Sequence, residues 1–303
     1  MKKVLVTGGT VFVSRFVAAY YVKKGYDVYV LNRNSRPQVP GVTLIEADRH
    51  DLQGKLKGYH FDVVLDITAY TRQDVQCLLA ELNACDTYIL ISSSAVYQET
   101  ATQPFIEDKG LGENAFWGAY GTNKLAAEQE LLAHIPDAYI LRPPYLYGPM
   151  NNVYREAFVF DCAMAKREFY LPKDGEMKLQ FFHVQDLCRF MDVIIEKKPA
   201  CHIFNVGNKQ AVSIREWVKL CYSAAGREPV FRNVYEKTEQ RNYFSFYDYE
   251  YYLDVSKQYA LMEDVTPLEE GLREAYSWYC MNQNQVNSKP FIAFIDANFA
   301  VRS

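Results

Sequence analysis

The chain has 303 residues, of which 49% are hydrophobic and 23% are charged, so it is long enough for one large α/β unit or for a main domain with a smaller partner. Its net charge of −4 and pI near 5.8 exclude a global attraction to nucleic acid or to anionic membranes. No apolar run approaches the roughly 20 residues of a membrane span, and a strand begins directly after Met-Lys-Lys, which leaves no room for a signal peptide.

The first 145 residues alternate apolar strands with amphipathic helices. We predict strands at 3–7, 27–32, 42–48, 61–68, 87–94 and 137–144, and helices at 12–25, 73–83 and 117–134. Continuous Val, Ile and Leu runs are typical of strands that are covered on both faces. The alternation therefore predicts an α/β fold with a doubly wound parallel sheet, the Rossmann arrangement.

Aromatic residues become dense after residue 144, although 202–207 again reads as a core strand. This pattern predicts a smaller, interleaved C-terminal substrate lobe. We assign residues 1–145 and about 180–208 to a dinucleotide-binding Rossmann domain, and about 146–179 and 209–285 to the lobe. Residues 286–303 follow a polar stretch and are again apolar. We expect them to form a docking strand or an added tail.

The seven cysteines are scattered and form no Cys-x-x-Cys pair, which predicts reduced thiols in a cytoplasmic protein. The five histidines lack the spacing of metal ligands. We therefore expect no metal site.

The turn after the first predicted strand, "VTGGT", resembles a dinucleotide site, in which backbone N–H groups bind a pyrophosphate. The candidate cofactor loop comprises Gly8, Gly9, Thr10, Val11 and Phe12. Val11 and Ser14 occupy two positions where further glycines would be expected. Ser14 is small enough for close packing, whereas Val11 would push the phosphates outward. A plain turn before a helix would give the same short pattern.

The second strand ends in "LNRNSRP", which contains Asn32, Arg33 and Arg36 but no acid. NAD enzymes usually place an acid here to bind the ribose 2′-hydroxyl, whereas arginine suits a 2′-phosphate. The pattern therefore favours NADP, unless these arginines are solvated surface residues. After the third strand, Asp48 and Arg49 would border the adenine, or Asp48 would cap the following segment.

A candidate catalytic group combines Tyr120 and Lys124, four residues apart on one face of a predicted helix, with the serines that end the fifth strand. A neighbouring ammonium would lower the pKa of the tyrosine, and a strand-end serine would bind a substrate hydroxyl or carbonyl. A Tyr-x-x-x-Lys pair alone is often only a surface pair. The glycine turn and the order of the elements favour the catalytic interpretation.

Together these motifs resemble the extended short-chain dehydrogenase/reductases of the NAD-dependent epimerase/dehydratase family, which includes UDP-glucose 4-epimerase. The resemblance covers about residues 3 to 280 and rests on "VTGGT", "DVVLDITAY", "SSSAVYQ", "YGTNK", "LRPPYLYGP", "LQFFHVQDLCRFM" and "FNVGN". It implies that Tyr120 is the catalytic base, Lys124 its partner and Ser93 the catalytic hydroxyl, with Ser94 as the second choice.

The resemblance also implies cofactor contacts at the ends of the fourth and sixth strands, from Asp66, Thr68, Ala69 and Pro143. Tyr120 and Lys124 would contact the cofactor as well. His183 and Asp186 match a family segment at the boundary of the lobe, which we interpret as mainly structural.

Departures from the family pattern leave the cofactor open between NAD and NADP. Besides the glycine turn and the missing acid, Gln98 replaces a glycine that commonly follows Val-Tyr. Family dehydratases usually carry an acidic pair just after the catalytic Thr, where this chain has Ser94 and Ala95, which argues against dehydration. The glycine turn and the second-strand end also resemble an atypical branch, some of whose members are similar to RNA-binding chloroplast proteins.

We therefore expect an NAD(P)-dependent enzyme of the epimerase/dehydratase type, with an epimerase favoured, whose partner is a small-molecule substrate of the nucleotide-sugar class. The candidate substrate-binding residues are Ser94, Tyr145, Arg155, Arg232 and Arg241, and a surface salt bridge is the alternative for each arginine. We expect no binding to nucleic acid or membrane. Family members often dimerise through the Tyr-Lys helix, so the resemblance also implies a homodimer.

Two other functions stay open. The first is an NADP-dependent reductase of a small carbonyl compound, which Arg33 and Arg36 suggest. The second is a non-catalytic RNA-binding or scaffold protein on the same fold, against which Ser93, Tyr120, Lys124 and the negative net charge argue.

Overall fold

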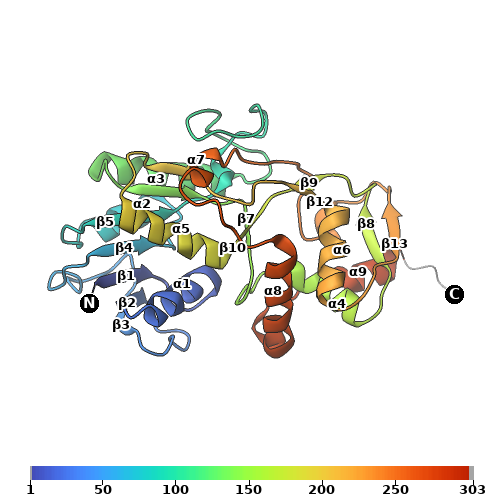
Figure 1. Ribbon diagram of the computed structural model, residues 1–303, viewed down its shortest axis with the longest axis horizontal. Coiled ribbons are helices and arrows are strands. Elements are labelled where there is room, and N and C mark those ends of the chain that lie inside the picture. The colour runs from blue at the N-terminus through green and yellow to red at the C-terminus, as the bar shows by residue number, and fades with distance from the viewer. Residues whose placement is uncertain (1, 300–303) are drawn as a thin grey trace.

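A seven-stranded parallel sheet forms one side of the molecule (Figure 1). The structure is a computed structural model and describes residues 2–299. In spatial order, the strands are β11 (Ile203–Asn205), β6 (Tyr139–Arg142), β5 (Thr87–Ile91), β4 (Val63–Asp66), β1 (Lys3–Thr7), β2 (Asp27–Asn32) and β3 (Thr43–Glu46). All neighbouring pairs are parallel, which confirms the predicted doubly wound α/β sheet.

The strand order reverses at β1, which lies between β2 and β4. The chain first builds outward from β1 to β3, and then crosses back to build β4, β5 and β6 on the other side. At such a point the connections leave in opposite directions, and a crevice opens beyond the carboxyl ends of the strands. The fold therefore places a ligand site at the carboxyl ends of β1 and β4.

Helices cover both faces of this sheet, as the apolar strand runs predict. Val4 and Val6 of β1 share a core with α1 (Phe12–Lys23) and α5 (Val184–Lys197). Leu5, on the opposite face of the same strand, shares a core with α2 (Arg72–Leu79) and α3 (Ala119–His134). The predicted helices at 12–25, 73–83 and 117–134 are thus present with bounds shifted by a few residues.

The remaining elements form a lobe beside the sheet. Its strands pair as β7 (Tyr145–Tyr147) with β10 (Phe181–His183), β8 (Phe169–Pro172) with β13 (Phe231–Val234), and β9 (Lys178–Leu179) with β12 (Val212–Ser213). Its helices are α4 (Glu156–Met164), α6 (Ile214–Ala224), α8 (Leu268–Asn282) and α9 (Phe291–Asn298), whereas the short helix α7 (Ser256–Tyr259) lies against β11 of the sheet. Of three short 3₁₀ turns, η1 (Ser94–Val96) follows β5 and contacts α3, and the others are η2 (Gln240–Asn242) and η3 (Gln283–Gln285).

The lobe has an aromatic core, which explains the aromatic density of the second half of the sequence. Fully buried Trp217 stacks on Phe181 with ring centroids 5.6 Å apart, and Phe246 meets Trp217 edge-on at 5.1 Å. Edge-on and offset ring pairs stabilise such a core beyond their buried area.

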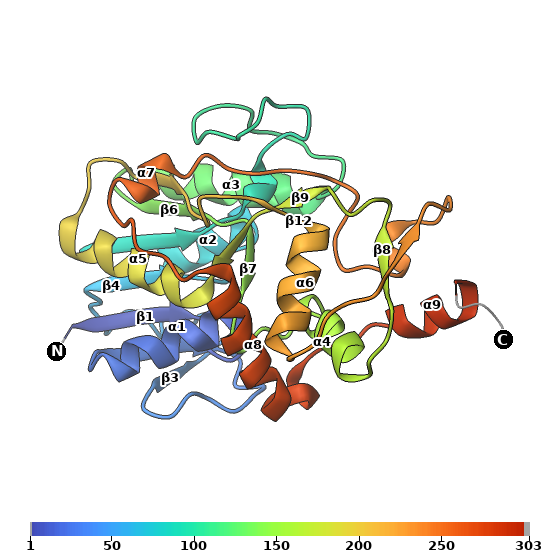
Figure 2. The same ribbon diagram turned by 45° about the vertical axis from the view of Figure 1, so that its right-hand side comes forward.

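The chain passes from the sheet to the lobe and back. It leaves the sheet after β6 and returns at β11, where Ile203 pairs with Ile140 of β6. Helix α8 contacts β7, β10, α4 and α6, and in the turned view it lies between the sheet and the rest of the lobe (Figure 2). We propose on this basis that the two domains interleave as the sequence predicts.

The segment after residue 285 differs from the docking strand considered above. Residues 291–298 form the helix α9 directly after Pro290, and Phe291 and Ile295 are buried against the lobe. An apolar spacing of four residues suits a helix face rather than an alternating strand. Residues 300–303 of this segment lie outside the described residues. Within residues 2–299, no helix is long and apolar enough to cross a membrane.

Candidate active site

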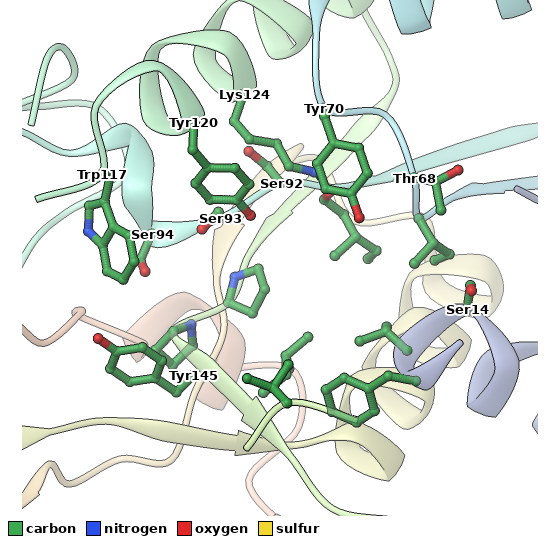
Figure 3. A pocket seen from close by; sticks show the side chains of 18 of the residues that line it. Ser14, Thr68, Tyr70, Ser92, Ser93, Ser94, Trp117, Tyr120, Lys124 and Tyr145 are labelled. Carbon is green, nitrogen blue, oxygen red and sulfur yellow. The ribbon is translucent and has the colours of Figure 1, made fainter. Parts of the chain in front are cut away.

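A cleft of about 480 Å³ opens at the carboxyl ends of β4, β5 and β6 and at the start of α1. Figure 3 shows the serines after β5, the Tyr120 and Lys124 side chains of α3, and Tyr145 around this cleft. Of the candidate residues, the cleft lining contains Val11, Phe12, Thr68, Ser93, Ser94, Tyr120, Lys124, Pro143, Tyr145 and Arg155. The fold thus brings the three catalytic candidates together from β5 and α3.

Two local features set the distance between Ser93 and Tyr120. Ser93 begins η1, and its Oγ accepts the backbone N–H of Ala95 at 3.1 Å. Gly121 follows Tyr120, and a Cβ at this position would overlap the Ala95 carbonyl oxygen. Only a residue without a side chain lets α3 approach the η1 turn this closely. The sequence analysis did not identify Gly121, although it stands inside the quoted "YGTNK".

Tyr120 is 41% exposed and lines the cleft. Burial of the hydroxyl raises the pKa of Tyr120 above its ordinary value, and a hydrogen bond with Ser93 and the charge of Arg155 act in the opposite direction. The expected lowering of the Tyr120 pKa by Lys124 is therefore not found in this arrangement. The reason is the direction in which the ammonium group points.

Lys124 is 2% exposed, and its Nζ donates to the carbonyl oxygens of Ala69 at 2.7 Å and Ile91 at 2.9 Å. Burial lowers the pKa of Lys124 to about 8, although Asp66 and Glu128 raise it. The ring of Tyr70 lies over the ammonium, with its centroid 4.8 Å from Nζ. Lys124 is thus anchored to the ends of β4 and β5, and Tyr70 is a cleft residue that the sequence analysis missed.

A buried ion pair holds the helix that carries Tyr120 and Lys124. Glu128, one turn after Lys124, accepts from Arg142 Nε at 3.0 Å and Nη2 at 2.6 Å, and it also accepts from the Ser92 hydroxyl. Arg142 is 1% exposed and donates in addition to the Tyr97 hydroxyl at 3.0 Å. A paired, fully hydrogen-bonded charge fixes its elements in place, because separating the partners would leave a buried charge.

The glycine turn has the geometry that its sequence suggested. Gly8 and Gly9 have φ angles of +90° and +93°, and a Cβ on Gly8 would come within 2.8 Å of Ser14 Oγ. Ser14 Oγ donates to the Val11 carbonyl at 3.0 Å. Val11 is the N-cap residue of α1, and its side chain accepts no hydrogen bond from the helix. The first backbone N–H groups of α1 therefore have no partner from the N-cap side chain. A phosphate group would satisfy them.

A second hollow of about 620 Å³ lies beside this turn, at the ends of β2 and β3. Of the candidate residues, its lining contains Gly8, Thr10, Val11, Asn32, Arg33, Arg36, Asp48, Arg49 and Thr68. Asn32 ties the β2 end to the turn, because its Nδ2 donates to the Gly8 carbonyl at 2.6 Å. Asp48 accepts the backbone N–H of His50 at 2.9 Å, as the capping alternative predicts, and also lies 3.8 Å from Arg33.

Some candidate residues lie beneath or outside these hollows. Asp66 is fully buried and lines neither hollow, because it accepts from Arg49 and from Thr7, each at 2.7 Å. Gly9 and Ala69 also line neither hollow. Within the described chain, both His183 ring nitrogens are buried without a hydrogen-bond partner. Asp186 accepts from Thr266 and Arg189.

Two of the three candidate arginines for substrate binding do not line the cleft. Arg232 of β13 pairs with Glu168, the residue before β8, at 2.8 Å. Arg241 donates to the Ser245 carbonyl and lies over the Tyr247 ring at 4.7 Å. Arg155 alone of the three lines the cleft. Trp117 and Tyr251 also line it, so its wall is more aromatic than the sequence analysis predicted.

Comparison with known proteins adds a family and several relatives. The model of the "NAD dependent epimerase/dehydratase family" matches residues 4–207. The chloroplast stem-loop binding protein of 41 kDa b from Arabidopsis thaliana is 28% identical over 301 residues, covering 91% of this chain and 79% of that protein. UDP-glucose 4-epimerase from Neisseria gonorrhoeae is 25% identical over 291 residues, covering 76% of this chain and 84% of that protein.

Solved structures share the fold at lower identity. UDP-glucuronic acid 4-epimerase from Bacillus cereus, in complex with UDP-glucuronic acid and NAD, superposes with a TM-score of 0.72 at 18% identity, covering 92% of this chain and 99% of that chain. The epimerase Mth375 from Methanothermobacter thermautotrophicus has a TM-score of 0.76 at 19% identity and covers 93% of each chain.

Proposed function

Because the chain belongs to the NAD-dependent epimerase/dehydratase family, we propose that it is an NAD(P)-dependent epimerase that acts on a nucleotide-sugar. The observation that carries the proposal is the meeting of Ser93, Tyr120 and Lys124 in one cleft at the carboxyl edge of the sheet. Relatives that are named as UDP-sugar epimerases support the substrate class.

The described residues fit a dinucleotide. The catalytic cleft and the second hollow share Val11 and Thr68, so a ligand with two nucleotide halves would extend from one to the other. The uncapped start of α1 lies at this junction, where a pyrophosphate would bind. Arg33 and Arg36 in the second hollow favour a 2′-phosphate, and hence NADP, whereas several fold neighbours are described in complex with NAD.

The proposed chemistry starts at a sugar hydroxyl. Tyr120, in its phenolate form, would accept the hydroxyl proton while the carbon loses hydride, and Ser93 would donate to the same oxygen as it becomes a carbonyl. Lys124 has three N–H donors and uses two on Ala69 and Ile91, which leaves one for the cofactor ribose. When bound, the nicotinamide accepts and returns the hydride. Return of hydride to the other face of the rotated keto sugar would complete epimerisation.

The test is the variant Tyr120→Phe, which removes the proton acceptor and keeps the ring. We expect at least a 100-fold loss of epimer formation from UDP-glucose or UDP-glucuronate, because a positioned acid–base group contributes 10²–10⁴ in rate. Product is measured by chromatography after incubation with NAD or NADP. Tyr235→Phe is the matched control, since Tyr235 is 71% exposed and lies outside the cleft lining. Equal rates for both variants would contradict the proposed base.

An NADP-dependent reductase of a small carbonyl compound is the second candidate, and the two arginines at the β2 end support it. An epimerase retains its cofactor through the cycle, whereas a reductase consumes it. Mass spectrometry of the gently denatured protein would identify a copurified dinucleotide. Stoichiometric loss of NADPH absorbance with a carbonyl substrate would favour the reductase, and no loss across a broad panel would exclude it.

A non-catalytic RNA-binding role is the third candidate, and the likeness to the chloroplast stem-loop binding protein supports it. Binding to phosphates is strongly salt-dependent, so a gel-shift titration with a stem-loop RNA at two salt concentrations tests it. RNA binding that falls with salt, together with no dinucleotide binding, would favour this role over the epimerase.

A further inference from the structure

The Tyr70 ring lies over the Lys124 ammonium in the cleft. Its ring centroid is 4.8 Å from Nζ, and Figure 3 shows the lysine nitrogen beside this ring. A cation at such a distance is attracted by the negative face of an aromatic ring. Tyr70 is 51% exposed, whereas Lys124 is 2% exposed. The half-exposed ring therefore shields the ammonium from the solvent of the cleft.

The start of α2 fixes the backbone of Tyr70. This residue lies in the loop between β4 and α2, and its N–H donates to Asp74 Oδ2 at 2.9 Å. The same oxygen accepts the N–H of Thr71 at 2.7 Å, in the capping box of α2. Ala69, directly before Tyr70, presents the carbonyl that accepts from Lys124 at 2.7 Å. Two consecutive residues of one loop thus contact the ammonium, one through its carbonyl and the other through its ring.

The carboxylates around Lys124 have other partners. The pairs are Asp66 with Arg49, Glu128 with Arg142, and Asp74 with His50. Tyr70 and Tyr120, whose ring centroids lie 6.4 Å apart, contribute the nearby phenol groups. Within residues 2–299 the ammonium donates to two uncharged carbonyls and faces the Tyr70 ring. The ring therefore offsets part of the cost of burying this charge.

We propose that Tyr70 is a positioning residue, whose ring holds the Lys124 ammonium on the carbonyls of Ala69 and Ile91 and keeps water from it. The inference rests on the proposed function and deepens it, because the direction of the ammonium matters for catalysis only if Lys124 binds the cofactor ribose. Tyr70 acts through Lys124 and needs no contact with the reacting atoms.

Removing the ring should change the titration of Lys124. Burial lowers the pKa of Lys124 from its ordinary value of 10.5 to about 8, so access of water should raise this pKa again. Loss of the attraction between ring and charge acts in the opposite direction. This second effect is the weaker one, because an ammonium is strongly hydrated in water.

The experiment labels the amines of the full chain with acetic anhydride at a series of pH values and follows Lys124 by peptide mass spectrometry. The neutral amine is the reactive form, so the pH midpoint of labelling reports the pKa and the rate at high pH reports accessibility. We expect Tyr70→Ala to raise the midpoint by about one pH unit, as partial relief of burial does, and to increase the rate at high pH. Tyr70→Phe keeps the ring and should match wild type in both.

Tyr235→Ala is the matched control, since Tyr235 is 71% exposed and lies outside the cleft lining. Circular dichroism verifies that each variant is folded. Tyr70→Leu repeats the test with a smaller loss of volume if Tyr70→Ala does not fold. An unchanged midpoint together with an unchanged rate in a folded Tyr70→Ala or Tyr70→Leu would overturn the inference and leave the proposed function intact.

Binding of the cofactor connects the inference to the proposed function. If Lys124 binds the cofactor ribose, Tyr70→Ala should weaken binding of NAD or NADP about three- to tenfold, because a more mobile side chain must be ordered on binding. Tyr70→Phe should restore the affinity. Wild type that binds neither dinucleotide and forms no epimer would overturn the proposed function, whereas the labelling result would still decide whether Tyr70 holds the ammonium.

Discussion

At the scale of single residues, the site departs from its family pattern at Val11. The structure shows why this departure is compatible with a site: Val11 has an extended backbone, with φ −134°, that needs no glycine. Its side chain lines both the catalytic cleft and the second hollow. Val11 therefore lies where a pyrophosphate would pass from the cleft to the second hollow. The size of its side chain limits the space available to the phosphates.

We predict that Val11→Gly tightens dinucleotide binding about fivefold, because removing one crowding side chain is worth about 1 kcal/mol. Glycine is tolerated at the start of a helix, so the fold should persist. Binding of NAD and NADP is measured by calorimetry. Val11→Leu, which adds volume at the same position, should weaken binding. Unchanged or weaker binding by Val11→Gly would show that the loop holds the phosphates in another way.

At the scale of elements, α3 and the η1 turn together set the geometry of the candidate catalytic residues. Their contact depends on backbone at Gly121, and the Glu128–Arg142 pair fixes the following turn of α3. The helix and its Tyr120–Lys124 spacing were predictable, since both depend on local sequence. The direction of the Lys124 ammonium was not, because the carbonyls that receive it belong to Ala69, in the loop after β4, and to Ile91, at the end of β5.

We predict that Gly121→Ala lowers the proposed epimerase activity about 100-fold, since displacing reacting groups by about 1 Å has this effect. The added Cβ would overlap the Ala95 carbonyl and force α3 away from Ser93. We also expect a loss of about 1–3 kcal/mol in unfolding free energy, measured by urea denaturation. Gly58→Ala is the control, because a Cβ there meets nothing within 4 Å. Normal stability and activity in Gly121→Ala would contradict this account.

At the scale of the whole molecule, the predicted Rossmann sheet is confirmed, whereas the lobe was predictable only in outline. Hydrophobic runs identify parallel strands because both faces are buried. The lobe strands are two to four residues long and pair across the sequence, as β8 does with β13, so no local pattern reveals them. The fold of this lobe determines that Arg155 lines the cleft and that Arg232 and Arg241 do not. For that reason the sequence alone could not distinguish the three arginines.

Global stability should depend on pH through His183, which is fully buried at the β10–α5 junction. Burial lowers its pKa to about 4, below the value of about 6.5 in an unfolded chain, although the Glu274 carboxylate lies 3.6 Å from Nε2 and favours the protonated form. Between these values the unfolded state binds more protons, so the unfolding free energy falls as pH decreases from 6.5 to 4. The full effect is roughly 3 kcal/mol.

Urea denaturation at several pH values measures this dependence. The variant His183→Leu cannot bind the proton and should lose stability less steeply between pH 6.5 and 4. His60→Gln, an exposed histidine, is the control and should follow wild type. Identical slopes for His183→Leu and wild type would assign the acid sensitivity to other groups.

The two ends of the described chain lie in different parts of the molecule. Strand β1 is central in the sheet, whereas α9 is packed on the far side of the lobe (Figure 1). A donor dye placed before β1 and an acceptor placed on the exposed face of α9 would therefore report the separation of sheet and lobe by energy transfer. The termini thus offer an optical gauge of the distance between sheet and lobe that leaves every cleft residue unmodified.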